Sequence, residues 1–378
     1  MRCDISQPQA RRLWLRAQRL NTDAPFGGGP QATPAAVQHL GYVQIDTINV
    51  IERCHHHILW TRIPDYRRDH LRQAQSVDRT VFEYWTHALS YIPVNDLRFF
   101  MGDMQRQRLS PRSWFSSVTE SDLRRVIARV RDNGALSIRD IDDDELVEKD
   151  HAWASRKPSK RALQLAFHIG KLTVSERTGM LKTYELMDRH FQWDRPPRKA
   201  SEKQVIDYLL DRALRSQGLV SLDSACHLNA WRKSLLRLAI EKRVKQGKLV
   251  PVAIDGAGKV EHWSLPETVA DIPPEAAGVH ILSPFDPLVI QRKRLKMFFG
   301  YEHLFEAYVP KEKRIYGYMG LPVLIDDEIV AVLDLKADRA RRELLLQAWT
   351  WVGRGRASAH KRLIEEKLDA FERFQFAP

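Results

Sequence analysis

Two segments in the middle of the chain repeat one another, and this repeat restricts the possible folds more than any other feature. The stretches "GALSIRD" at 134–140 and "GLVSLDS" at 218–224 share a glycine, two apolar residues, a serine and a further apolar residue. Each is followed by a helical pattern that ends in "GKL", at 170–172 and at 247–249. A strand, a polar turn and a second strand follow each "GKL". The chain is therefore predicted to contain repeated α+β units.

The order of elements within each repeat is that of a winged helix. A helix, a short strand, further helices and a closing hairpin make up this fold, which commonly places a helix in the major groove of DNA. A third, weaker copy opens the chain, because a helical pattern over 34–40 ends at Gly41 and "YVQID" follows it as a strand. Proline-rich stretches at 191–200 and 266–278, and a junction at 108–117, are predicted domain boundaries that divide the chain into four blocks.

The last quarter of the chain has a different pattern. Short alternating runs between 279 and 336 are separated by polar or proline-containing turns, and "IDDEI" is expected to turn a hairpin. A helix is predicted at 358–375. The predicted domains are a first winged helix at 1–107, a second at 108–195, a third at 196–270, and a small β-barrel-like domain with a C-terminal helix at 271–378.

Composition restricts the classes of partner. The chain has 60 Lys and Arg against 48 Asp and Glu, a net charge of +12 and a pI near 9.6, which favours a polyanionic partner such as nucleic acid or an anionic membrane surface. The N-terminus lacks the apolar core of a signal peptide, and no run of eighteen apolar residues occurs, so we expect a cytoplasmic protein without membrane association. The three cysteines are far apart, and "CHHH" at 54–57 lacks a second ligand group, so we predict no disulfide and no metal site.

One amide and one carboxylate stand two positions apart in "GYVQIDTIN" at 41–49. Alternation along a strand would send Gln44 and Asp46 to the same side, with α-carbons about 6–7 Å apart. A water held between them could lose a proton to Asp46 while Gln44 fixes its direction. The alternative is that Asp46 caps a turn and Gln44 is an exposed strand residue.

Further candidate side chains gather in "VFEYWTHALSYIP" at 81–93. Glu83, Trp85 and His87 combine an acid, an aromatic ring and an imidazole, a combination that suits a nucleobase. The alternative places Trp85 in the core and makes His87 a core histidine with its hydrogen bonds satisfied.

Basic side chains on two segments are candidates for binding DNA phosphates. A helix at 158–170 would bury Leu163, Ala166 and Phe167 and leave its basic residues on the other face. That face could also simply be solvated. The residues predicted to contact phosphates are Lys157, Lys160 and Arg161, with Arg292, Lys293 and Arg294 from the last block.

Several long stretches together resemble one family. "LGYVQIDTINVIERCHHHILWTRIPDY", "FEYWTHALSYIP", "WASRKPSKRALQLAFHIGKLTVSER", "ILSPFDPLVIQRKRL" and "YGYMGLPVLIDDEIVAVLDLKADR" stand in the order and at the spacing of the AlkZ/YcaQ-like winged-helix DNA glycosylases of bacteria. The similarity covers nearly the whole chain. It implies tandem winged helices in a C-shaped arrangement, followed by a β-barrel-like domain.

The resemblance also implies an activity. The family excises N7-alkylated purines, including crosslinked ones, from double-stranded DNA without a metal or organic cofactor, and its motif is a glutamine, an aliphatic residue, and an aspartate or second glutamine. Here the motif reads Gln44-Ile45-Asp46, which is similar to the YcaQ branch that tolerates bulky and crosslinked lesions. Gln44 and Asp46 are thus the expected catalytic residues of a monofunctional glycosylase acting as a monomer, with Asn49, Glu83, Trp85 and His87 as expected substrate contacts.

Two other functions stay open at this stage. A non-catalytic winged-helix DNA-binding protein or transcriptional regulator would share the fold without the chemistry. A nuclease would need clustered carboxylates for Mg²⁺, and "DDDE" at 142–145 offers such a cluster.

Overall fold

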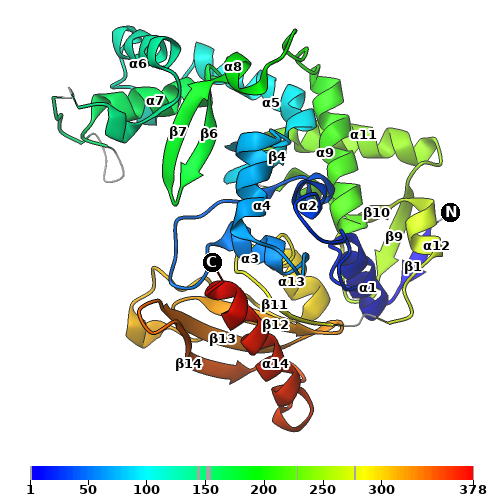
Figure 1. Cartoon of the computed structure of the whole chain (residues 1–378). Coiled ribbons are helices and arrows are strands. Elements are labelled where there is room, and N and C mark those ends of the chain that lie inside the picture. Colours follow the sequence, from blue (N-terminus) through cyan, green and yellow to red (C-terminus); the bar gives the residue numbers. More distant parts are fainter. Residues whose placement is uncertain (1, 143–144, 150–154, 228, 276–277, 378) are drawn as a thin grey trace. The chain divides into compact units, whose positions relative to one another are not determined.

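The computed structural model describes residues 2–142, 145–149, 155–227, 229–275 and 278–377, and mixes helices with four sheets (Figure 1). Its chain divides into two compact units. The first contains Met1–Arg68, Thr86–Leu89 and Ile206–Pro378, and the second contains Asp69–Trp85 and Ser90–Val205. Each unit takes segments from several of the predicted domains, so the four-domain division stays a prediction.

The first unit begins with a sheet in the order β1-β9-β10-β8, in which β1 runs parallel to β9 and the other pairs are antiparallel. The side chain of Ser6 accepts a hydrogen bond from the backbone of Gln9 and starts the helix that follows β1. The elements of this part are β1 (Cys3–Ile5), α1 (Gln7–Ala17), α2 (Ala32–Leu40), β2 (Val43–Gln44), α3 (Cys54–Trp60), β8 (Leu219–Val220), α10 (Leu222–Cys226), α11 (Lys233–Lys245), β9 (Val250–Ile254), β10 (His262–Ser264) and α12 (Pro266–Ala270).

The rest of the first unit is an antiparallel sheet in the order β11-β12-β13-β14. Its elements are β11 (Val279–Ile281), α13 (Arg292–Phe299), β12 (Gly320–Ile325), β13 (Glu328–Asp338), β14 (Glu343–Trp351) and α14 (Ala357–Gln375). Ile325 pairs with Glu328 across a two-residue turn, which confirms the hairpin predicted at "IDDEI". Within the described residues the strands follow one another as an open sheet and not as a closed barrel. The last helix, α14, packs on β11 and β14 (Figure 1).

One hydrophobic core joins both sheets of the first unit. Trp14 of α1 is fully buried and meets Phe298 of α13 edge to face, with ring centroids 5.7 Å apart. Ile5 and Val252 from the first sheet and Val332 from the second belong to the same cluster. Burying such aliphatic and aromatic side chains contributes about 1.5–3 kcal/mol each, so this core is the main stabilising feature of the unit.

The second unit contains a three-stranded sheet in the order β5-β7-β6 and the helices around it. Its elements are β3 (Val81–Trp85), α5 (Leu97–Leu109), α6 (Glu120–Asn133), β5 (Leu136–Ser137), α7 (Pro158–His168), β6 (Leu172–Thr178), β7 (Leu181–Leu186) and α8 (Met187–Phe191). Three elements contain residues of both units, namely α4 (Arg68–Arg72), β4 (Leu89–Pro93) and α9 (Glu202–Gln217).

The predicted ends of the helices in the two repeats are confirmed. The helix α7 ends just before Gly170, whose φ is +70°, and the pair β6 and β7 follows; α11 ends before Gly247, whose φ is +69°, and β9 and β10 follow. Glycine suits both positions because other residues adopt positive φ at a steric cost. The predicted helices at 34–40 and 358–375 correspond to α2 and α14.

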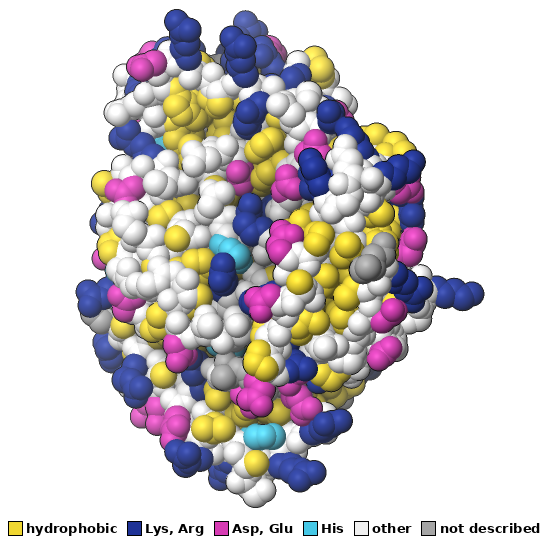
Figure 2. Space-filling view, turned by 90° about the vertical axis from the view of Figure 1, so that its right-hand side faces the viewer, with side chains coloured by type: hydrophobic (Ala, Val, Ile, Leu, Met, Phe, Trp, Pro, Cys, Tyr) yellow, Lys and Arg dark blue, Asp and Glu magenta, His cyan; other side chains and the backbone are white. Residues whose placement is uncertain are grey.

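On the face shown in Figure 2, Lys and Arg side chains are interspersed with Asp and Glu side chains. Net charge alone therefore does not single out a phosphate-binding surface there. No helix in the described part of the chain combines the length and the hydropathy needed to cross a bilayer.

Candidate active site

The Gln44-Ile45-Asp46 segment lies in the first unit, where a short strand follows the end of α2. Gly41 ends α2 with φ +79°, and a Cβ there would lie 2.4 Å from the side chain of Arg212, so only glycine fits without a shift. The strand β2 then covers Val43–Gln44, and the N–H of Ile45 donates to the carbonyl of Leu89 over 2.8 Å. Val43 and Ile45 are buried, which anchors the segment on both sides of Gln44.

The carboxamide of Gln44 is held by a histidine. Its Oε1 lies 2.9 Å from Nε2 of His87, and Gln44 is 6% exposed. Because Oε1 can only accept, Nε2 of His87 donates, and Nδ1, which lies 3.3 Å from the Thr86 hydroxyl oxygen, is the unprotonated nitrogen. This bond fixes the direction of the amide and points its NH₂ group away from His87.

The imidazole of His87 is neutral at physiological pH. Burial, together with the charges of His227 and Arg212, lowers its pKa to about 3. Its ring meets Tyr42 edge-on at 5.2 Å and His227 at 4.5 Å between centroids, and the guanidinium of Arg212 lies 5.6 Å from the Tyr42 ring centroid. The donor to Gln44 is therefore present throughout the physiological range.

The carboxylate of Asp46 lies beyond the end of β2. One oxygen, Oδ1, accepts from the N–H of Ile48 over 2.8 Å, and the residue is half-buried. The other oxygen, Oδ2, has no hydrogen-bond partner within the described ranges. Since β2 ends at Gln44, strand alternation does not extend to Asp46, so the predicted strand over both residues is wrong and alternation does not align their side chains. The turn-capping alternative accounts for Oδ1 but leaves Oδ2 available to a water.

A cysteine connects the two motif residues. The Sγ of Cys54, the first residue of α3, donates to the carbonyl of Gln44 over 3.1 Å. Burial raises the pKa of this thiol, and the charge of Asp46 raises it further. Cys54 is thus a protonated thiol that holds the backbone of the motif against α3.

The remaining residues of the "CHHH" run support the fold. His56 Nδ1 lies 2.7 Å from the Tyr66 hydroxyl, and His57 Nε2 lies 2.7 Å from the carbonyl of Ile281. Burial lowers the pKa of His56 to about 3 and that of His57 to about 4, so both are neutral. No group of metal-ligating side chains occurs among the residues that the structure describes. Asp143 and Asp144 of the "DDDE" run lie outside those residues.

Asn49 is engaged with the second sheet of the same unit. Its Oδ1 accepts from Arg339 over 2.9 Å, and the neighbouring carbonyl of Val50 accepts from the N–H of Ala337 over 2.8 Å. The chain leaving the motif is thereby tied to the end of β13. A substrate contact through Asn49 would have to use its amide NH₂ or displace Arg339.

Glu83 is a core residue of the second unit, and its predicted role in lining a lesion pocket is wrong. The side chain is 0% exposed and forms a bidentate ion pair with Arg177, with N–O distances of 2.5 and 2.7 Å. Gln75 donates to the same carboxylate over 3.0 Å. Burial raises the pKa of Glu83, but Arg177 outweighs this effect and lowers it below its usual value. The carboxylate is therefore committed to partners within the second unit and is closed to solvent.

Trp85 also lies in the second unit. Its ring stacks on His168 with centroids 3.8 Å apart and an interplanar angle of 24°, and the ammonium of Lys182 lies 5.9 Å from its centroid. The indole is half-buried, so a substrate contact through its free edge stays a prediction.

The six residues predicted to contact phosphates differ in their exposure to solvent. Lys160, Arg292 and Lys293 are exposed, while Lys157 is half-buried and donates to the carbonyl of Ile141 over 3.2 Å. The prediction is wrong for Arg161, which is 4% exposed and donates to the Ser117 hydroxyl and to two backbone carbonyls. These contacts fasten the loop before α7 to that helix.

The predicted phosphate contact is also wrong for Arg294. It is 6% exposed and lies 4.3 Å from the ring centroid of Trp14 and 4.9 Å from that of Phe298. Burial lowers its pKa to about 9. The guanidinium stacks within the core of the first unit and does not face solvent.

Four residues around the motif were not predicted as part of the site: Tyr42, Cys54, Arg212 and His227. Tyr42 is adjacent to the motif, and its aromatic ring was a usable signal. Arg212 and His227 are more than 160 positions from Gln44, so no local pattern could connect them with it.

The residue types of the motif and their hydrogen bonds are compatible with hydrolytic chemistry. Asp46 Oδ2 is a carboxylate oxygen available to accept a proton, and Gln44 offers an amide whose orientation is fixed. Such a pair can orient and deprotonate one water and stabilise positive charge developing next to it.

Comparisons with known proteins give a consistent answer. Residues 37–374 match the family model described as "DNA glycosylase AlkZ-like", which covers most of the chain and includes the motif. A solved structure, the Streptomyces sahachiroi DNA glycosylase AlkZ, is similar to this chain with a TM-score of 0.63 and 16% sequence identity, over 98% of this chain and 97% of that one. At this identity the structural match shows a shared α+β fold.

Proposed function

Since the chain belongs to the AlkZ-like family of DNA glycosylases, we propose that it hydrolyses the N-glycosidic bond of cationic N7-alkylated purines in duplex DNA. One observation carries the proposal. Within the Gln-Ile-Asp motif, His87 fixes the amide of Gln44, and Asp46 keeps a carboxylate oxygen free. The aspartate at the third position assigns the chain, in this proposal, to the YcaQ-like branch and extends the substrates to interstrand crosslinks.

The proposed step is balanced by water alone. Alkylation at N7 gives the purine a formal positive charge, so the bond from C1′ to N9 breaks with its electron pair going to a base that leaves neutral. The water oxygen bonds to C1′, and Asp46 Oδ2 takes its proton. Asp46 also stabilises the oxocarbenium-like sugar by its negative charge. No metal or organic cofactor takes part in this step.

Gln44 positions the water in this scheme. With Oε1 committed to His87, the NH₂ group donates to the water oxygen and leaves the water protons directed at the carboxylate. His87 is thus a positioning residue that acts through Gln44, which replaces its predicted role in lining the lesion pocket. A lone pair of this kind gives a modest acceleration, which suits substrates whose bond is already labile.

The partner in this proposal is double-stranded DNA, bound by a monomer. Lys160, Arg292 and Lys293 are exposed and are proposed to contact phosphates, with Lys157 as a weaker candidate. The helix, strand and hairpin order at 108–195 and at 196–270 supports reading both segments as winged helices.

Base release from alkylated duplex tests the proposal. The protein is incubated with DNA containing N7-methylguanine, and the released base is measured for wild type and for Asp46→Asn. We expect release by wild type and a loss of at least tenfold in the variant. No release by either protein would leave the DNA-binding alternative, because a regulator would bind the duplex without cleaving the base.

Adding EDTA or borohydride to this assay distinguishes hydrolysis from the other reaction types. Release that persists in EDTA contradicts a Mg²⁺-dependent nuclease. Borohydride traps a covalent intermediate only if an amine attacks the sugar, so we expect no trapped protein. Recovery of an intact abasic strand completes the assignment as a monofunctional hydrolase.

A further inference from the structure

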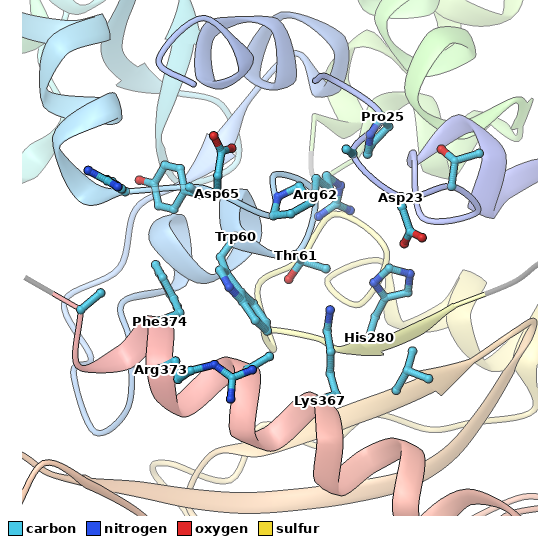
Figure 3. Close-up of a pocket in the computed structure, with 18 residues that line it drawn as sticks. Asp23, Pro25, Trp60, Thr61, Arg62, Asp65, His280, Lys367, Arg373 and Phe374 are labelled. Atoms are coloured by element: carbon cyan, nitrogen blue, oxygen red, sulfur yellow. The ribbon is translucent and has the colours of Figure 1, made fainter. Parts of the chain in front are cut away.

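A cavity of about 460 Å³ lies within the first unit, away from the motif residues described above. It is lined by the end of α3 and the turn after it, by the loop at 22–25, by the start of β11, and by one face of α14 (Figure 3). This volume falls in the range of small-molecule sites. The candidate active site and its proposed reaction use none of the residues that line it.

Two polar groups in the cavity wall lack the partners that buried groups normally have. Lys367 of α14 is half-buried, and its Nζ lies 4.8 Å from the ring centroid of Trp60. Within the described ranges it forms neither a hydrogen bond nor an ion pair. In Figure 3 its side chain extends from α14 into the space between Trp60 and His280.

His280 is the second of these groups. Its Nε2 donates to the carbonyl of Leu20 over 2.9 Å, so Nδ1 carries a lone pair that can only accept. The residue is 8% exposed, and Nδ1 has no partner among the residues described. A buried polar atom of this kind usually marks a water, an ion or a ligand. The cavity lining thus includes a cationic donor, Lys367, and a residue with an unpartnered neutral acceptor, His280.

The charges around the cavity favour an anion. Lys367 and Arg373 contribute positive charge from α14, while Asp65 and Arg67 in the turn after α3 carry opposite charges that cancel in the sum. Arg62 is already neutralised by its buried ion pair with Asp286. Asp23, from the loop at 22–25, is an exposed carboxylate that partly offsets Lys367 without forming an ion pair with it. Burial lowers the pKa of Lys367, which an anion in the cavity would reverse.

The acceptor at Nδ1 narrows the class of anion. A carboxylate is ionised at neutral pH and has no proton to donate to His280. A phosphomonoester has a second pKa near 6, so its monoanion carries both a P–O⁻ for Lys367 and a P–OH for Nδ1. We propose that this cavity binds a phosphomonoester, with Lys367 and His280 as its two direct contacts and Arg373 at the rim.

Two sources supply a phosphomonoester to a DNA-binding protein, namely a free mononucleotide and the 5′-phosphate at the end of a DNA strand. Calorimetric titration with inorganic phosphate and with a deoxynucleoside 5′-monophosphate measures the first. The second is measured by comparing duplexes that carry a 5′-phosphate or a 5′-hydroxyl and are otherwise identical. Preference for the phosphorylated duplex without binding of free nucleotide would assign the site to strand ends.

The variant Lys367→Met removes the charge and keeps the stem that covers Trp60. We expect it to weaken phosphomonoester binding about tenfold to hundredfold, the range for a charge-assisted hydrogen bond. Lys361→Met on the same helix is the matched control, because Lys361 is exposed and lies outside the cavity. Base release from a duplex with 5′-hydroxyl ends should be unchanged in both variants.

Proton linkage tests the contact with His280. The bound state holds one proton between the phosphate and Nδ1, while at pH 8 free phosphate and free imidazole hold none there. Affinity should therefore rise as the pH falls from about 8 to about 6. The proposal is overturned if wild type binds no phosphomonoester probe, if Lys367→Met binds as tightly as Lys361→Met, or if affinity does not change with pH.

Discussion

The hydrogen bond between His87 and Gln44 gives the sharpest prediction about the candidate site. Replacing His87 with alanine removes the Nε2 donor, which lies 2.9 Å from Gln44 Oε1. Gln44 is 6% exposed, so its carbonyl oxygen would be left without a partner in a nearly dry environment. The amide could then rotate, and the proposed water would lose its fixed donor.

The size of the effect follows from the cost of that bond. Leaving a buried acceptor unsatisfied costs about 1–3 kcal/mol, and each 1.36 kcal/mol of lost transition-state stabilisation is a factor of ten in rate. We therefore expect the single-turnover rate of base release by His87→Ala to fall about fivefold to 150-fold, with little change in DNA affinity. Neighbouring contacts to Tyr42 and His227 would be lost as well, so folded protein must be verified by circular dichroism.

A conservative variant and a pH profile separate positioning from mere packing. His87→Gln carries an NH₂ group that can donate to Gln44, and it should recover most of the lost rate. Because the pKa of His87 is lowered to about 3, the wild-type rate should show no inflection near pH 6.5 from this residue. The reasoning is refuted if His87→Ala releases base at the wild-type rate, or if His87→Gln is as slow as His87→Ala in a well-folded protein.

Three further predictions concern stability and binding. Asp286→Ala should lower the free energy of unfolding in urea by about 3–5 kcal/mol, because it leaves the fully buried Arg62 unpaired. Glu366→Ala, which breaks an exposed pair, should change it by less than about 1 kcal/mol, and equal effects would contradict this account. Stability should fall as the pH drops below about 6.5, since burial lowers the pKa of many histidines and the unfolded chain takes up protons first; a flat profile between pH 7 and pH 5 would contradict it. Neutralising Arg292 and Lys293 together should reduce the salt dependence of DNA binding by about two in log–log slope, and an unchanged slope would exclude both as phosphate contacts.

Local signals in the sequence were enough to place many elements. Gly41, Gly170 and Gly247 each stand where a helix ends and a strand begins, and all three have positive φ. The requirement is local because the terminating residue itself must adopt that conformation. For the same reason "IDDEI" identified its hairpin, in which Asp326 has φ +52°.

Partners far apart in sequence could not be predicted from local patterns. Glu83 pairs with Arg177, 94 positions away, and Arg294 stacks on Trp14, 280 positions away. A helical pattern shows which face carries a basic residue but not whether a loop covers that face, as one covers Arg161. The motif was found from sequence, whereas its link to His87 depends on the fold.

The hydrolytic role of the motif is tested most directly by single-turnover kinetics of Asp46→Asn. Wild type and variant are each used in excess over duplex containing N7-methylguanine, so that every DNA molecule is bound and the rate reports the chemical step. The account predicts unchanged DNA affinity and a base-release rate at least tenfold slower in the variant, because the amide that replaces the carboxylate cannot accept the proton from water. Equal rates for the two proteins would contradict it.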